Sequence, residues 1–128
     1  MGIEVHLNNE IKDISSLNAD AYVIATGSKP KHFNIEGSEK AIDAIDYLNG
    51  KEVGETVAVI GGGLTGCEIA YELYLQGKKP IIVEMKDDLI TQRGVCLANS
   101  SYLRDFFKLH KIPTYLETKL SSIGDNEI

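Results

Sequence analysis

Three glycines and one glutamate have the types and the spacing to bind a phosphorylated ligand. Gly61, Gly63 and Gly66 form a G-x-G-x-x-G pattern directly after the apolar run TVAVI, and Glu84 follows eighteen residues after the last glycine. We assign the first glycine to a sharp turn, the second to close approach of the backbone to a pyrophosphate, and the third to tight packing of a helix on a strand. Glu84 is placed to accept hydrogen bonds from adenosine ribose hydroxyls. The pattern predicts a dinucleotide site; a glycine turn that binds nothing is the alternative.

The predicted binding residues lie around these two positions. The first N–H groups of a helix lack intrahelical acceptors and lie at the positive end of its dipole, so they attract an anion without Lys or Arg. The predicted dinucleotide-binding residues are Gly61, Gly62, Gly63, Leu64, Thr65, Gly66, Glu68, Glu84, Met85 and Lys86. Lys86 either covers the adenine edge or is solvated, and solvation is our default. We assign no catalytic acid, base or nucleophile and no metal ligand.

A strand–helix–strand unit is needed to position these residues. The β-branched run at 56–60 predicts a strand, the helical apolar period from residue 64 to a stop at Gly77 predicts a helix, and residues 80–85 predict a second, parallel strand. By the same period, the inner face of the helix holds Gly66, Ile69, Ala70 and Leu73, and its outer face holds Tyr71, Glu72 and Gln76.

The remaining elements complete an α/β fold. We expect strands at 3–7, 20–27 and 114–116, a loop at 27–39, and helices at about 42–49, ended by Gly50, and about 99–110. The last helix and the residues just before it are expected to contribute five side chains to the core: Leu97, Leu103, Phe106, Phe107 and Leu109. The predicted fold class is a Rossmann-like parallel sheet with flanking helices, in three layers and truncated.

An internal repeat leads to a specific strand order. Residues 3–14 and 112–123 align without gaps, as duplicated domains would leave them. We predict that Ala21–Ala25 docks beside Val57–Ile60, because an unpaired central strand would expose its backbone donors and acceptors. The expected parallel order is 114–116, 81–84, 57–60 and 21–25.

Composition excludes several classes of partner. The chain has 128 residues, a formal net charge of -6 and a pI near 5.0, and its basic residues are scattered, which argues against binding to nucleic acid or an acidic membrane. No apolar run approaches the roughly 20 residues that span a bilayer, so we expect a cytoplasmic protein. We interpret Cys67 and Cys96 as reduced thiols. Cys67 is either a small core residue, which we favour, or a reactive thiolate at a helix start.

Two motifs and the sequence around them carry a family resemblance. The chain resembles the FAD/NAD(P)-dependent flavoprotein reductases in the motif GETVAVIGGGLTGCEIAYEL, which is preceded by DAYVIATGSKP. Within that family it looks most like the group of NADH oxidase, 2-enoate reductase and 2,4-dienoyl-CoA reductase. This second resemblance is carried by the segments GSKP…IEG…AIDAIDYLNGKEVGE…VEMKDDL. The resemblance implies an oxidoreductase that passes hydride from NADH to FAD, with FMN and an iron–sulfur cluster elsewhere in the parent. It also implies that Thr26 and Gly27 lie near FAD there. Glu68 either approaches the nicotinamide, as in that family, or is a solvated charge.

The resemblance further implies a fragment of a larger flavoprotein. We expect residues 1–30 to be a remnant of the FAD domain ending in the ATG motif, 31–54 a connecting segment, and 55–128 an NAD(P)H-binding domain that is incomplete at its C-terminus. NADH is the cofactor expected here, the partners are the dinucleotide and the rest of the parent, and the chain alone is expected to be inactive. The alternative is a non-redox module that holds ADP or AMP. A disulfide oxidoreductase is disfavoured, because that chemistry needs a second cysteine nearby.

Overall fold

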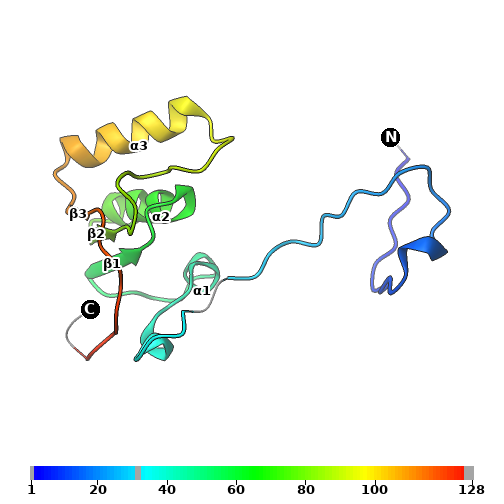
Figure 1. Ribbon diagram of the computed structural model, residues 1–128, viewed down its shortest axis with the longest axis horizontal. Coiled ribbons are helices and arrows are strands. Elements are labelled where there is room, and N and C mark those ends of the chain that lie inside the picture. Colours follow the sequence, from blue (N-terminus) through cyan, green and yellow to red (C-terminus); the bar gives the residue numbers. More distant parts are fainter. Residues whose placement is uncertain (1, 31–32, 126–128) are drawn as a thin grey trace.

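A three-stranded parallel sheet organises the protein. The computed structural model describes residues 2–30 and 33–125. The strands β1 (Thr56–Ile60), β2 (Lys79–Val83) and β3 (Thr114–Tyr115) lie in the order β1-β2-β3, with Val59 opposite Ile82 and Ile82 opposite Thr114. Flanking helices complete the Rossmann-like α/β class (Figure 1). The three strands of the glycine-containing region therefore have the predicted order and direction.

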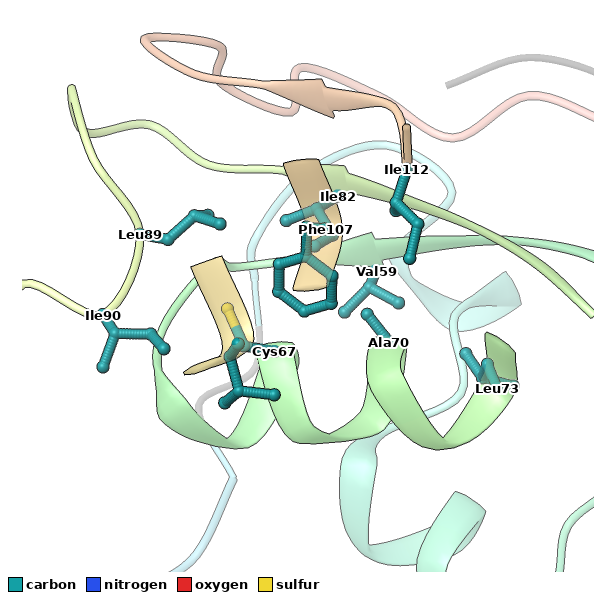
Figure 2. Packing of buried hydrophobic residues seen from close by; sticks show 10 residues of the cluster. Val59, Cys67, Ala70, Leu73, Ile82, Leu89, Ile90, Phe107 and Ile112 are labelled. Carbon is teal, nitrogen blue, oxygen red and sulfur yellow. The ribbon is translucent and has the colours of Figure 1, made fainter. Parts of the chain in front are cut away.

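The core lies between the sheet and the helices α2 (Leu64–Leu75) and α3 (Leu97–Leu109) (Figure 2). From α2, Cys67, Ala70 and Leu73 are fully buried, whereas Tyr71 is half-buried and contacts Phe106 of α3 with ring centroids 4.6 Å apart. Of the predicted inner face, Ala70 and Leu73 are buried and Ile69 is partly buried against the core, so this part is confirmed. Tyr71, which was expected to face away, does not. The reason is that α2 is covered by α3 as well as by the sheet, so its apolar surface is wider than one stripe.

The prediction that five side chains of α3 lie in the core is wrong for two of them. Leu103 and Phe107 are buried, but Leu97 and Leu109 are 75% and 76% exposed. A helix turns by about 100° per residue, so Leu109, two residues after Phe107, points to the opposite side. Leu97 lies at the first residue of α3, before the helix packs against α2.

The N-terminal segment contradicts the predicted strands at 3–7 and 20–27. Residues 2–29 are exposed and contain only the short 3-10 helix η1 (Ile14–Ser16), and Val23 and Ile24 are 92% and 78% exposed. Ala21–Ala25 does not pair with β1, which among the described residues pairs with β2 alone, and the segment extends away from the sheet (Figure 1). An apolar pattern makes a strand only when a neighbour supplies the hydrogen bonds, and 20–27 has none here.

The connecting segment contains two short helical turns. The 3-10 helix η2 (Ser38–Lys40) is followed by α1 (Ala44–Leu48), whose N-terminus is capped by the Asp43 carboxylate. Ile123 donates its N–H to the carbonyl of Glu36 at 2.9 Å, which ties residues 120–125 to this segment. Residues of α1, β1 and α2, with Leu120 and Ile123, line a groove of about 940 Å³. Within the described residues, no helix is long and apolar enough to cross a bilayer.

Candidate functional site

The turn between β1 and α2 depends on the first glycine of the pattern. Gly61 has φ +108°, a conformation that side-chain-bearing residues rarely adopt. Its N–H donates to the carbonyl of Val83 at 2.8 Å, so β1 stays bonded to β2 up to the point where the chain turns. This glycine turn, residues 61–63, is only three residues long, and α2 begins at Leu64.

Gly66 and Gly62 are held too tightly to carry a side chain. A Cβ on Gly66 would lie 1.9 Å from the carbonyl oxygen of Gly61, so the first turn of α2 sits directly on the glycine turn. A Cβ on Gly62 would lie 2.4 Å from the Leu89 side chain and 2.9 Å from the Glu84 Cβ. Sequence reasoning gave Gly62 no role of its own. The signal for such a role was that Gly62, the middle of three consecutive glycines, is not required by the G-x-G-x-x-G pattern.

Gly63 is the open member of the set. It is the N-cap of α2 with φ -70° and ψ -179°, which any residue can adopt, and no side chain caps the helix. A Cβ there would meet only the side-chain amide of Gln92, at 3.6 and 3.8 Å. There is therefore space over Gly63, next to the N–H groups of Leu64 and Thr65 in the first turn of α2. This arrangement can accept an anion.

Glu84 lies one residue beyond the end of β2 and is only 8% exposed. One carboxylate oxygen accepts the N–H of Gly62 at 2.6 Å, and the other accepts the N–H of Lys86 at 2.8 Å. The glutamate thus joins the end of β2 to the glycine turn. Because a carboxylate has about four acceptor sites, each oxygen retains one for a ligand hydroxyl.

The other predicted residues near Glu84 and on α2 are at the surface. Met85 is 66% exposed, and the Lys86 ammonium donates to the Thr91 hydroxyl at 2.8 Å, so it is held by its own loop. Glu68 is exposed on the second turn of α2. The structure thus brings the residues at 61–68 and 84–86 to the carboxyl ends of β1 and β2, where ligands of open α/β sheets bind.

Thr26 and Gly27 are not part of this assembly. Both lie in the exposed N-terminal segment, where a Cβ on Gly27 would meet nothing within 4 Å. Their assignment near FAD in a larger protein stays a prediction.

Sequence reasoning missed the loop that follows Glu84. Ile90 donates its N–H to the carbonyl of Gly62 at 2.7 Å, and Leu89 and Ile90 are buried beside the start of α2 (Figure 2). The loop also brings Gln92 to Gly63. The apolar pair at 89–90 was the available signal, because two buried side chains in a loop mark a segment that packs against something.

Cys67 is part of the core. It is fully buried, its thiol donates to the carbonyl of Gly62 at 3.4 Å, and burial raises the pKa of the thiol to about 12, although the positive charge of Arg104 acts in the other direction. A thiolate is strongly disfavoured at this position. The interpretation as a small core residue is confirmed, and Cys96 is exposed.

Comparison with known families decides the affiliation of the chain. The model of the pyridine nucleotide-disulphide oxidoreductase family matches residues 2–128. The chain belongs to this family. The resemblance to FAD- and NAD(P)-dependent flavoprotein reductases is thereby confirmed.

The relatives include NADH oxidase, one of the enzymes that the sequence was found to resemble. The chain is 41% identical over 129 residues to cinnamate reductase of Clostridium sporogenes, covering 98% of this chain and 19% of the relative. It is 41% identical over 97 residues to NADH oxidase of Thermoanaerobacter brockii, covering 69% of this chain and 15% of the relative. A 2-naphthoyl-CoA reductase structure superposes with a TM-score of 0.71 at 25% identity, over 80% of this chain and 16% of that one. The chain therefore spans less than a fifth of the length of these relatives.

Proposed function

We propose that this chain is the NADH-binding part of a flavoprotein oxidoreductase and delivers hydride from NADH to FAD. The observation that carries the proposal is the open position over Gly63 at the uncapped N-terminus of α2, together with the Glu84 carboxylate, which is bonded to the neighbouring Gly62. Pyrophosphate fits the first of these groups and a ribose diol fits the second.

The residues of the chain supply binding and orientation. The N–H groups at the start of α2 hold the pyrophosphate, and the positive end of the helix dipole offsets its charge in a protein of net charge -6. Glu84 keeps its bonds to Gly62 and Lys86 and accepts the ribose hydroxyls on its free lone pairs. The cofactors themselves supply the hydride chemistry when bound.

The names of the relatives support a redox role. Relatives called cinnamate reductase and NADH oxidase are consistent with an electron path that begins at NADH. For the larger protein we keep the predicted division into 1–30, 31–54 and 55–128, with FAD, FMN and an iron–sulfur cluster outside the NADH site. The chain alone is predicted to be inactive.

A second function has its own supporting observation. Every glycine and carboxylate contact described above serves the adenosine and pyrophosphate half of a dinucleotide. The same contacts would hold ADP or AMP as a permanently bound, non-redox nucleotide.

Rapid mixing of NADH with the flavoprotein that carries this chain separates the two functions. Under anaerobic conditions, hydride delivery predicts bleaching of the flavin, competitive inhibition by ADP-ribose, and loss of the bleaching in Gly63→Val. Tight binding of ADP or AMP with no flavin reduction by NADH would favour the non-redox module instead.

A further inference from the structure

A polar side chain lies beside the open position over Gly63. The Oε1 and Nε2 atoms of Gln92 are 3.6 and 3.8 Å from the point where a Cβ on Gly63 would stand. These are the nearest atoms to that point outside the chain neighbours of Gly63. A group bound over Gly63 must therefore contact or displace the Gln92 amide.

The loop that carries Gln92 is fixed to the glycine turn. Ile90 donates to the carbonyl of Gly62 at 2.7 Å, and the Leu89 side chain fills the space where Gly62 lacks a Cβ. Ile90 itself has φ +51°, a left-handed conformation that is costly for a β-branched residue. Surrounding bonds must hold this conformation in place.

Arg104 of α3 supplies bonds on the other side of the loop. Its guanidinium donates to the carbonyls of Leu89 and Ile90 and pairs with the Asp88 carboxylate at 3.2 Å, and it is only 25% exposed. Arginine suits this task because its planar group offers five donors in a fixed arrangement. The loop is thus held between α3 and the glycine turn, and Gln92 follows two residues later.

We propose that Gln92 binds the pyrophosphate of the dinucleotide together with the α2 N-terminus, and that Arg104 positions it. This inference rests on the proposed function and adds a ligand that the glycine pattern does not contain. The amide has two N–H donors for phosphate oxygens. The Gln92 amide is uncharged, so it needs no oppositely charged partner, although Glu84, Asp87 and Asp88 lie close to it in the sequence.

The first test measures binding of NADH, ADP-ribose and adenosine to Gln92→Ala and Gln92→Glu. Loss of a hydrogen bond to a charged group should weaken NADH and ADP-ribose about tenfold in Gln92→Ala. Gln92→Glu should weaken them further, because its carboxylate faces the phosphates. Adenosine, which lacks phosphate, should bind all forms equally. Gln76→Glu, the same exchange at the far end of α2, is the matched control and should leave every affinity unchanged.

The second test separates positioning by Arg104 from a purely structural role. In the otherwise wild-type protein, Arg104→Ala should lower both the melting temperature and the affinity for NADH. In the Gln92→Ala background, the same substitution should lower the melting temperature as before but leave the affinity nearly unchanged. Arg104→Lys should restore only part of the affinity, since an ammonium cannot make the forked contacts.

The outcomes distinguish this inference from the function beneath it. If wild-type protein binds no NADH, the proposed function fails and the inference fails with it. If wild-type protein binds NADH and Gln92→Ala binds ADP-ribose equally well, only the inference is overturned. An equal affinity loss from Arg104→Ala in both backgrounds would overturn the positioning role alone.

Discussion

At the residue scale, the site consists of backbone groups and one carboxylate. The spacing in the sequence was enough to predict the roles of Gly61 and Gly66, because a positive φ and a close helix contact are requirements that only glycine meets. The bond from Gly62 to Glu84 could not be predicted, since it depends on how the end of β2 lies against the turn. The position of Gln92 depends in the same way on a loop held by α3.

Glu84 leads to a prediction about nucleotide choice. The extra 2′-phosphate of NADPH would lie close to its carboxylate, and Lys86 is held by Thr91. Two unit charges about 4 Å apart repel by about 1 kcal/mol in water and about 4 kcal/mol near a protein surface. We therefore expect NADH to bind at least about tenfold more tightly than NADPH, with a smaller ratio in Glu84→Gln. A preference of the wild type for NADPH would contradict this and would point to Lys86 or Arg93 as a phosphate ligand.

Cys67 predicts how stability depends on pH. Its thiol has a pKa of about 12 in the folded chain and an ordinary value of 9.0 when unfolded. The unfolded chain therefore loses this proton first, and the thiol's contribution to stability, fully present below pH 9, is lost as the pH rises to about 12. Chemical denaturation across this range should show a steeper loss for wild type than for Cys67→Ala. Identical pH profiles would contradict the raised pKa.

At the element scale, prediction worked where an element finds its partner nearby in the sequence. The strand at 56–60 was predicted to the residue, because its β-branched run ends directly in glycine and pairs with the strand one helix away. The segment 20–27 has an equally apolar pattern, but no strand of the described part of the chain lies beside it, and it is exposed. Local pattern measures suitability for a strand, whereas pairing decides whether one forms.

The packing of α3 on α2 gives a prediction at this scale. Phe107 lies within the shared core (Figure 2) and is 3% exposed. Leu109 on the same helix is 76% exposed. We expect Phe107→Ala to lower the free energy of unfolding by about 3 kcal/mol or more. Leu109→Ala, the control on the opposite face, should change it by no more than about 0.5 kcal/mol. Similar losses in the two variants, measured by denaturant titration, would show that α3 is rotated from the orientation described.

At the scale of the whole molecule, the site and the core belong to one part of the chain. The residues that form the sheet, the core and the glycine turn lie between 47 and 115. The N-terminal residues 2–29 are exposed (Figure 1). The binding that we propose for this acidic chain would therefore attract an anionic ligand through the backbone dipoles of one helix and not through the net charge.

The exposed N-terminal segment can therefore be removed. Deletion of residues 1–27 should shift the melting temperature by no more than about 2 °C, because surface changes away from the core contribute little to stability. The NADH affinity should stay within about twofold. A large fall in melting temperature would mean that 21–25 does dock beside β1, as the internal repeat had suggested.

Calorimetric titration of NADH into wild type, Gly63→Val and Gly66→Val tests the central claim most directly. Gly63 has an ordinary backbone conformation and open space above it, so valine there should lower the melting temperature by only a few degrees, because valine is a poorer N-cap than glycine. Its methyl groups would occupy the pyrophosphate position. Gly66→Val should instead unfold the protein at lower temperature, because its Cβ would meet the carbonyl of Gly61 at 1.9 Å. The account predicts saturable binding by wild type and none by Gly63→Val, with both proteins folded at the temperature of the titration. No binding by wild type, or equal binding by wild type and Gly63→Val, would contradict it.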